Sequence, residues 1–274
     1  MNKFIFPANP IAPRVLCFTT TKRPGASAGD FAENNLAEHV GDDAQAVAKN
    51  RHSLNLDLAE LLNSSPEDKN HISPKEIAYL NQVHSNKVAD FSQDNWADED
   101  YDGCYSKLLC QPIAVMTADC LPVVLASLTS SEYAVVHAGW KGLKNGILQN
   151  ALNKFKAHPE EISAWIGPSI CQTHFEVNEE VAKQFSAYAD AISFNAQTQK
   201  YHIDLNEIAK SQLANMGLHL ISLSGVCTYC DPRLYSYRQA THQKLQQISA
   251  GASKNNVDQG LVACGRVATV VLRY

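Results

Sequence analysis

The chain has 274 residues, a mass of 30.1 kDa and a formal net charge of −5. Its composition, 45% hydrophobic and 19% charged, is that of a globular protein with room for one or two domains. It contains no run of Lys and Arg that would follow a phosphate backbone, so we expect no nucleic-acid partner.

The sequence also argues against a membrane or export role. Its longest apolar run, around Leu121–Leu128, is far below the roughly 20 residues that span a bilayer. Near the N-terminus Pro7, Pro10 and Pro13 interrupt the apolar patch before a signal peptide could form. We therefore expect a soluble, cytoplasmic protein without a membrane partner, whose eight cysteines are free thiols, ligands or catalysts rather than disulfides.

The first predicted elements are a strand and a helix. Residues 14–21 are rich in β-branched side chains and predict a strand. From Asp43 onward, apolar side chains recur on one face at helical spacing, and either Asp42 or Asp43 can cap the helix start: the apolar residues are Val47, Leu54, Leu58, Leu61 and Leu62. Arg51 lies on or beside this face and is a candidate functional cation.

The middle of the chain predicts a series of strands. An acidic segment, residues 92–103, is expected to be a solvated surface loop. The apolar, β-branched runs predict strands at residues 76–84, 86–91, 112–120, 121–128 and 132–140.

The remainder alternates helices and strands without a fixed repeat period. Apolar side chains recur every four residues after Trp140 and predict a helix over residues 143–155. The patterns further predict helices at 178–188 and 205–217, and strands at 162–170, 201–205, 218–226 and 265–272. We therefore expect an α/β or α+β sandwich that forms a single domain over residues 1–274.

Three side chains that bind soft metals or act as nucleophiles stand at the ends of apolar runs: His84, Cys120 and His137. They are too far apart in sequence for a local zinc finger, so only a folded scaffold could bring them together. Zinc binds His nitrogen and Cys sulfur in a tetrahedron, and a catalytic site uses three protein ligands and one open position. The residue types therefore fit an open zinc site.

Two other chemistries use the same atoms. Cys120 with His137 as general base would make a thiol hydrolase, in which Asp119 or another acceptor orients the imidazole. Two histidines and a cysteine with a weak axial methionine, here Met116, would instead suit blue copper. The residue types alone leave these alternatives open.

Other Cys and His residues give weaker signals. Cys227-x-x-Cys230 invites a second metal or redox site, but a zinc ribbon needs a second cysteine pair and none is present. We therefore interpret both as half-buried thiols. His39 has no matching partner and is expected at the surface or in the core.

Several motifs together resemble one known family. They are HVGDD (39–43), NR (50–51), NQVHS (81–85), TADCLPVVL (117–125), HAGWKG (137–142), GPSICQTHFEV (167–177), CTYCDPRLYSYR (227–238) and the final GR-A-VVL. The chain resembles the YfiH-type family, also called the multicopper polyphenol oxidase or laccase-domain family, from about Thr19 to the C-terminus. The resemblance implies a four-layer α/β/β/α sandwich. It also implies Zn²⁺ bound by His84, Cys120 and His137, and purine nucleoside phosphorylase activity accompanied by adenosine deaminase and methylthioadenosine phosphorylase activities.

The implied substrates are purine nucleosides and phosphate, and the implied chemistry needs cations that hold phosphate. Arg51, Lys141, Arg238 and Arg266 are the candidates, with Lys141 best placed beside the glycine-rich helix entrance. Asp119 or Asn81 are candidates for the general acid, and Asp119 equally for orienting a ligand. Nothing in the sequence distinguishes a monomer from a homodimer.

The sequence departs from the family pattern in three places. Lys141 replaces an arginine of HAGWRG, Gln239 replaces a second arginine after SYR, and a long segment, Gln239–Cys264, precedes the final GR. These departures bear on substrate reach and loop closure.

Three rival functions remain at this stage. A copper oxidase needs H-x-H pairs, which none of the ten histidines form, so Cu²⁺ would enter only by metal substitution. The residue types also allow the Cys-His hydrolase described above, and the family resemblance allows an editing factor that acts on cell-wall precursors.

Overall fold

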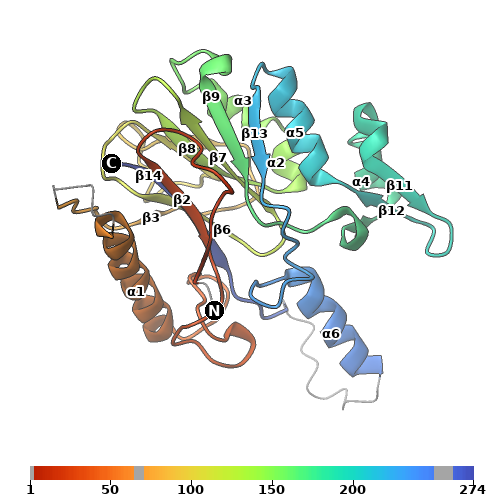
Figure 1. The fold of residues 1–274 in the computed structure, drawn as a ribbon. Helices are drawn as coiled ribbons and strands as arrows, with labels where there is room; N and C mark the ends of the chain where they lie inside the picture. Colours follow the sequence, from red (N-terminus) through yellow and green to blue (C-terminus); the bar gives the residue numbers. More distant parts are fainter. Residues whose placement is uncertain (1–2, 65–70, 250–261) are drawn as a thin grey trace.

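The computed structural model describes residues 3–64, 71–249 and 262–274, and two β-sheets form its centre (Figure 1). The five-stranded sheet has the order β1 (Phe4–Ile5), β2 (Val15–Thr20), β14 (Val267–Arg273), β6 (Ile113–Thr117) and β3 (Ala78–Tyr79). The six-stranded sheet has the order β13 (Leu220–Leu223), β9 (Ile162–Ile166), β7 (Leu121–Ser127), β8 (Tyr133–Ala138), β5 (Gly103–Ser106) and β4 (Val88–Asp90).

Helices cover the outer face of each sheet. Helix α1 (Ala44–Asn63) packs on the five-stranded sheet, and α2 (Trp140–Lys144), α3 (Ile147–Leu152) and α5 (Leu205–Asn215) pack on the six-stranded sheet. Three separate hydrophobic clusters fill the spaces between the four layers. The expected α/β/β/α sandwich is therefore confirmed.

Smaller elements extend the sandwich at one side. A small sheet of β10 (Glu176–Val177), β12 (Lys200–Ile203) and β11 (Ile192–Asn195) lies beside α4 (Glu179–Lys183). Helix α6 (Tyr237–Ser249) projects away from the sheets (Figure 1). Short 3₁₀ helices occupy Gly29–Phe31, Pro159–Glu161, Gln172–His174 and Ser186–Ala191.

The central strands are almost wholly apolar because both of their faces are buried. On β6, Ile113 and Val115 face the space between the sheets, whereas Ala114 and Met116 face α1. Strands β7 and β8 alternate in the same way between the inner layer and the layer under α3 and α5. This double burial explains why the sequence shows continuous apolar runs instead of alternation.

The predicted first helix is confirmed, and its start has a specific cap. The Asp43 carboxylate accepts a hydrogen bond of 2.9 Å from the backbone N–H of Ala46. Val47 is buried, and Leu54, Leu58 and Leu62 are buried against the five-stranded sheet. Such a cap contributes about 1 kcal/mol to helix stability.

Four predicted elements differ from the structure. The strands expected at 76–84 and 86–91 are short, and they belong to different sheets as β3 and β4. The single helix expected over 143–155 breaks into α2 and α3 at Gly146, whose φ of 81° lies in the left-handed region. The helix expected over 178–188 is only α4 followed by a 3₁₀ segment.

Two chain crossings between the sheets prepare the functional site. The chain passes from β3 to β4 through residues 80–87, and from β6 to β7 through Ala118, Asp119 and Cys120. Strand β8 pairs with β7 so that Leu121 opposes Ala138 and Pro122 opposes His137. Cys120 therefore lies beside the end of β8.

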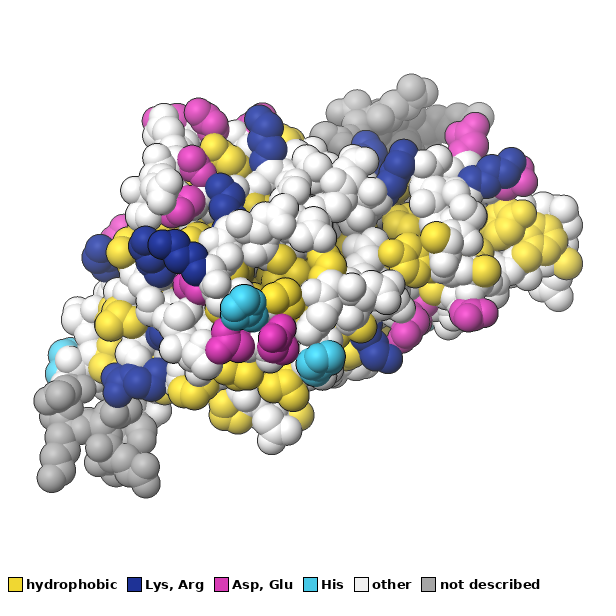
Figure 2. Space-filling view, turned by 90° about the horizontal axis from the view of Figure 1, so that it is seen from above, with side chains coloured by type: hydrophobic (Ala, Val, Ile, Leu, Met, Phe, Trp, Pro, Cys, Tyr) yellow, Lys and Arg dark blue, Asp and Glu magenta, His cyan; other side chains and the backbone are white. Residues whose placement is uncertain are grey.

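The view from above shows both charge signs on the molecular surface (Figure 2). On the described part of this face, Lys and Arg side chains alternate with Asp and Glu rather than forming one continuous band.

None of the helices within the described residues is long and apolar enough to cross a bilayer.

Candidate metal centre and its cavity

The fold brings His84, Cys120 and His137 together. One ligand atom from each lies within 4.8 Å of the other two. The Cys120 Sγ is 3.9 Å from His84 Nε2, and the two imidazole rings are 4.7 Å apart between centroids. The two segments that cross between the sheets and the end of β8 thus each contribute one possible ligand to the same site.

The loop that carries His84 has a fixed, unusual conformation. His84 has a φ of 61°, in the left-handed region that non-glycine residues rarely adopt. Gln82 anchors this loop to β6, because its amide exchanges hydrogen bonds of 2.9 and 2.7 Å with the backbone of Met116.

Asp102 joins this loop to the buried histidine. Its carboxylate accepts hydrogen bonds from the backbone N–H groups of Val83 (3.2 Å), His84 (3.0 Å) and Ser85 (2.5 Å). It also accepts a 2.7 Å bond from His137 Nδ1, and its side chain is fully buried. Asp102 therefore fixes the tautomer of His137 and leaves Nε2 for a ligand, which is the usual partner arrangement at metal-binding histidines.

Asp102 is a site residue that the sequence pattern does not reveal. We expected residues 92–103 to be a solvated acidic loop, but the end of that segment enters β5 and is buried. Strand β5, which begins at Gly103, has the sequence GCYS and contains no β-branched residue, so no local signal marks Asp102 as buried. Its acceptor role comes from contacts 17 to 35 residues away in sequence, which no local pattern reveals.

The electrostatics of the cluster favour a thiolate. Burial alone would raise the pKa of Cys120, but the adjacent His137 and His84 outweigh it and lower this pKa to about 6. Burial would lower the pKa of His137, but the Cys120 thiolate and Asp102 raise it to about 9. Between about pH 6 and pH 9, the cluster without metal therefore favours a Cys120 thiolate beside a protonated His137 imidazole.

The donor set and the space around it fit a metal ion. A thiolate and two imidazole nitrogens are typical zinc ligands, and three such ligands leave one position open. The glycine after β8 makes this approach possible, because a Cβ on Gly139 would lie 3.0 Å from Cys120 Sγ and 3.3 Å from His84 Cδ2. Any larger residue would displace the ligands.

The three ligands line a cavity of about 370 Å³. This volume suits a small organic ligand. The other lining side chains include aromatic rings and two guanidinium groups: His39, Trp140, Phe175, Tyr237, Arg238 and Arg266. The sequence suggests no partner for His39 and a place at the surface or in the core, whereas the structure places it in the cavity wall.

Comparison with known proteins places this geometry in a family. Residues 16–250 match the family described as multi-copper polyphenol oxidoreductase laccase. The chain belongs to this laccase family. The purine nucleoside phosphorylase YfiH of Shigella flexneri is 35% identical over 242 residues, which cover 87% of this chain and 94% of that protein. The protein of the same name from Escherichia coli K12 has the same identity and coverage.

A solved structure gives the same relationship. Neisseria meningitidis protein NMB0706 superimposes with a TM-score of 0.79 at 28% sequence identity, covering 99% of both chains. The laccase-family fold is thus shared along the whole chain.

Within this laccase-family fold, two of the predicted phosphate-binding cations lie in the cavity wall. Arg238 and Arg266 line the cavity, and neither forms an ion pair with a carboxylate in the described part of the chain. The Arg238 guanidinium donates to the backbone carbonyls of His174 (3.1 Å) and Glu176 (2.9 Å). The Arg266 guanidinium donates to the carbonyl of Cys264 at 2.7 Å.

The other candidates lie outside the cavity lining. Arg51 pairs with Glu38 at 2.8 Å and lies over the Tyr79 ring, so it holds α1 to the sheet. Lys141 lies at the start of α2, as expected, and is exposed, but its side chain does not line the cavity, and its Nζ lies 5.7 Å from the centroid of the Trp140 ring. Asn81 donates to Asp100 at 2.5 Å on the exposed side of its loop.

Asp119 lines the cavity, but its carboxylate is already engaged. It accepts 2.7 Å hydrogen bonds from the Thr228 hydroxyl and from the backbone N–H of Arg238. Its φ of 97° shows that the backbone is held in an unfavourable region beside Cys120. Asp119 therefore fixes the segment that carries Arg238, which fits an orienting role better than proton transfer.

Proposed function

We propose that this protein is a zinc-dependent purine nucleoside phosphorylase. It would convert adenosine, inosine or methylthioadenosine and phosphate into the free base and ribose-1-phosphate. The observation that carries the proposal is one cavity that combines three possible metal ligands, several aromatic rings and two guanidinium groups that form no ion pair among the described residues. The names of the Shigella and Escherichia relatives support the same activity.

Phosphate is the first substrate that the cavity is suited to bind. Arg238 and Arg266 present planar donors that match phosphate oxygens, and no carboxylate competes for them among the described residues. The Arg238 guanidinium donates to the carbonyls of His174 and Glu176, and the backbone N–H of Arg238 donates to Asp119. These hydrogen bonds fix the guanidinium in place before the substrate binds.

The nucleoside is expected to lie between the arginines and the metal ligands. Trp140, Phe175 and Tyr237 offer ring faces on which a purine can stack. In phosphorolysis a phosphate oxygen forms the bond to ribose C1′ while the C1′–N bond breaks, and the base leaves with that electron pair. The cavity must therefore stabilise negative charge on the departing base.

The metal ligands are placed for that role. His84, Cys120 and His137 would hold the ion, and Asp102 would keep His137 Nε2 directed toward it. When bound, the ion supplies a positive charge and a Lewis acid at the open position. A sulfur and two nitrogens favour zinc over the octahedral oxygen-binding metals.

Copper oxidation fits the geometry less well, despite the family description. Neither of the two close His and Cys groups in the described part of the chain contains more than two histidines. A cluster of several copper ions needs many paired imidazoles. We therefore propose that Cu²⁺ binds only by replacing zinc.

A thiol hydrolase is the second candidate, and one observation favours it. His137 lies between Cys120 and Asp102, as the base of a nucleophilic triad would. Such a mechanism needs no contribution from His84, whereas the metal mechanism requires it. Adenosine deamination, which the family resemblance implies, would use the same cavity with water in place of phosphate.

A single assay distinguishes these functions. Purified protein is incubated with inosine or adenosine, with and without phosphate, and ribose-1-phosphate, free base and ammonia are measured beside the zinc content. We expect phosphate-dependent base release that is lost in His84→Ala together with one zinc ion. Full activity in His84→Ala, with loss only in Cys120→Ser and His137→Ala, would favour the thiol hydrolase.

The cellular compartment follows from the thiols. All eight cysteines are unpaired in the structure, including three in one close group. We propose that the protein works in a reducing compartment such as the cytoplasm.

A further inference from the structure

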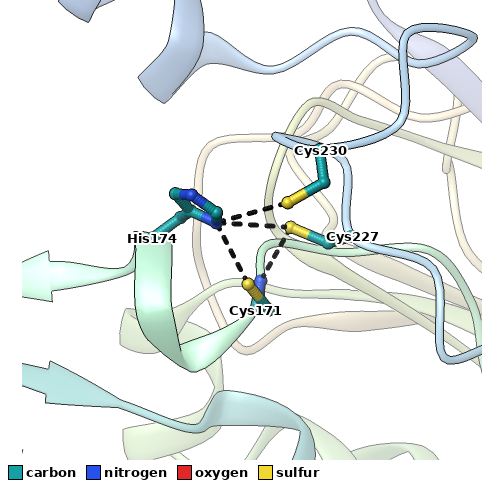
Figure 3. Close-up of side chains that lie close together, drawn as sticks. All are labelled: Cys171, His174, Cys227 and Cys230. Atoms are coloured by element: carbon teal, nitrogen blue, oxygen red, sulfur yellow. Dashed lines mark hydrogen bonds between the residues drawn. The ribbon is translucent and has the colours of Figure 1, made fainter.

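A second group of metal-type ligands lies outside the set that lines the cavity. It consists of Cys171, His174, Cys227 and Cys230, whose ligand atoms all lie within 4.8 Å of one another (Figure 3). We propose that these four side chains bind a second metal ion, a structural zinc ion that ties the loop after β9 to the loop after β13.

The distances match a tetrahedral site. Zinc bonds of about 2.3 Å to sulfur and about 2.0 Å to nitrogen place these atoms about 3.5 Å apart across a tetrahedron. The His174 Nδ1 is 3.2 Å from Cys171 Sγ, 3.5 Å from Cys230 Sγ and 3.9 Å from Cys227 Sγ. An ion at the centre would need shifts of only a few tenths of an ångström.

The sheet topology explains how the two halves meet. Strands β9 and β13 are parallel neighbours, so their carboxyl ends lie side by side. A β-bridge between Ser169 and Cys227 joins the loops that follow. The N–H of Ser169 donates to the carbonyl of Val226 at 3.2 Å, and the carbonyl of Ser169 accepts from the N–H of Thr228 at 3.1 Å. Each loop then contributes two ligands separated by two residues.

Each half has the local geometry of a metal-binding turn. In the second turn the carbonyl of Cys227 accepts hydrogen bonds from the N–H groups of Cys230 (3.2 Å) and Asp231 (2.9 Å). The backbone N–H of Cys171 donates to Cys227 Sγ at 3.3 Å, which stabilises negative charge on that sulfur (Figure 3).

The imidazole of His174 is held in the required direction. Its ring stacks on Tyr229 with centroids 4.0 Å apart and an angle of 12° between planes. Tyr229 is in turn fixed by a 3.1 Å hydrogen bond between its hydroxyl and His242 Nδ1. The ring therefore presents Nδ1 to all three sulfurs without further rearrangement (Figure 3).

Four protein ligands leave no position for a substrate, so the site is of the structural type. Its role follows from what the two loops carry. Phe175 and Ile170 line the cavity beside the first loop, and Arg238 follows the second loop and donates to the carbonyl of His174. The ion would thus hold the arginine-bearing wall of the cavity.

No second pair of cysteines matches Cys227-x-x-Cys230, so the sequence alone favours two half-buried thiols. In the structure they lie beside Cys171-x-x-His174, whose His174 is 53 residues before Cys227. A histidine in place of a fourth cysteine therefore conceals this group from a search for paired cysteines, and Cys230 is exposed rather than half-buried.

The test is a zinc count on purified full-length protein. Wild-type protein, grown with zinc and washed free of loosely bound metal, is expected to contain about two zinc ions per chain by elemental analysis. The Cys227→Ser, Cys230→Ser double variant is expected to contain about one. Cys110→Ser, a half-buried thiol outside both groups, is the matched control and should retain about two.

A second variant keeps the test valid if the serine protein does not fold. The His84→Ala, His137→Ala double variant leaves the proposed site intact and is expected to retain about one zinc ion. Cobalt in this variant should show the intense charge-transfer absorption of a site with several thiolates. These counts do not depend on phosphorolysis, so the second site can fail or succeed separately from the proposed function.

Three results would overturn the proposal. One is a wild-type zinc content that the serine double variant leaves unchanged. Another is a His84→Ala, His137→Ala protein that holds no zinc. The third is a titration of the denatured chain that finds about six free thiols instead of all eight, because that would show a disulfide in place of the metal.

Discussion

Replacing Asp102 by asparagine tests the architecture of the metal centre. The carboxylate accepts four hydrogen bonds, three from backbone N–H groups and one from His137. An asparagine offers one acceptor oxygen, and its amide group would face donors, so about two charge-assisted bonds are lost. At roughly 1.5–3 kcal/mol each, we expect Asp102→Asn to lower the free energy of unfolding by about 3–6 kcal/mol.

The same change should weaken metal binding. Without the carboxylate, His137 is free to adopt the other tautomer, and loss of such a partner typically reduces metal affinity by about 10–100-fold. Denaturant titration measures the stability, and competition with a chelator measures the zinc affinity. Asp100→Asn is the control, because Asp100 is a nearby exposed residue whose carboxylate accepts a hydrogen bond from Asn81 and none from the metal-site residues. Wild-type zinc affinity in Asp102→Asn would refute the reasoning.

Three further predictions concern the ligand space, the phosphate cations and acid stability. Gly139→Ala places a methyl group 3.0 Å from Cys120 Sγ, so zinc affinity should fall by about tenfold; unchanged affinity would show that the site is looser than described. Arg238→Ala should raise the KM for phosphate by about 10–100-fold, whereas Lys141→Ala should leave it nearly unchanged, and steady-state kinetics at varied phosphate decide between the two. Burial would raise the pKa of Glu132, but hydrogen bonds from the backbone N–H of Lys156 and from other donors outweigh burial and lower this pKa. The stabilising effect of the Glu132 carboxylate is therefore complete above about pH 5 and is lost as pH falls. Between pH 7 and pH 4 the melting temperature of Glu132→Gln should therefore fall less than that of the wild type. Equal falls would contradict the proposed role of Glu132.

Much of the layered fold could be predicted from the sequence. The apolar runs at 112–120, 121–128 and 132–140 correspond to β6, β7 and β8, because strands buried on both faces must be apolar throughout. The N-terminal helix was equally clear, since its cap and apolar face are local features. The three proposed ligands could be named because each belongs to a specific motif.

The rest depends on contacts that no local pattern encodes. Strands β3 and β4 are neighbours in sequence but lie in different sheets, and only the sheet topology separates them. Asp102 gains its partners from residues 17 to 35 positions away, so no local pattern distinguishes it from the other acidic residues of its segment. Besides Cys171, the cysteines that His174 contacts lie 53 and 56 residues away. The exposure of Lys141 could not be predicted because it depends on how α2 leaves the end of β8.

The most direct test of the central claim is zinc reconstitution of the chelator-treated protein while ribose-1-phosphate formation from inosine and phosphate is followed. The account predicts that metal-free protein is inactive and that activity returns as zinc is added, but not in His84→Ala. Full phosphate-dependent activity in protein shown to contain no metal would contradict it.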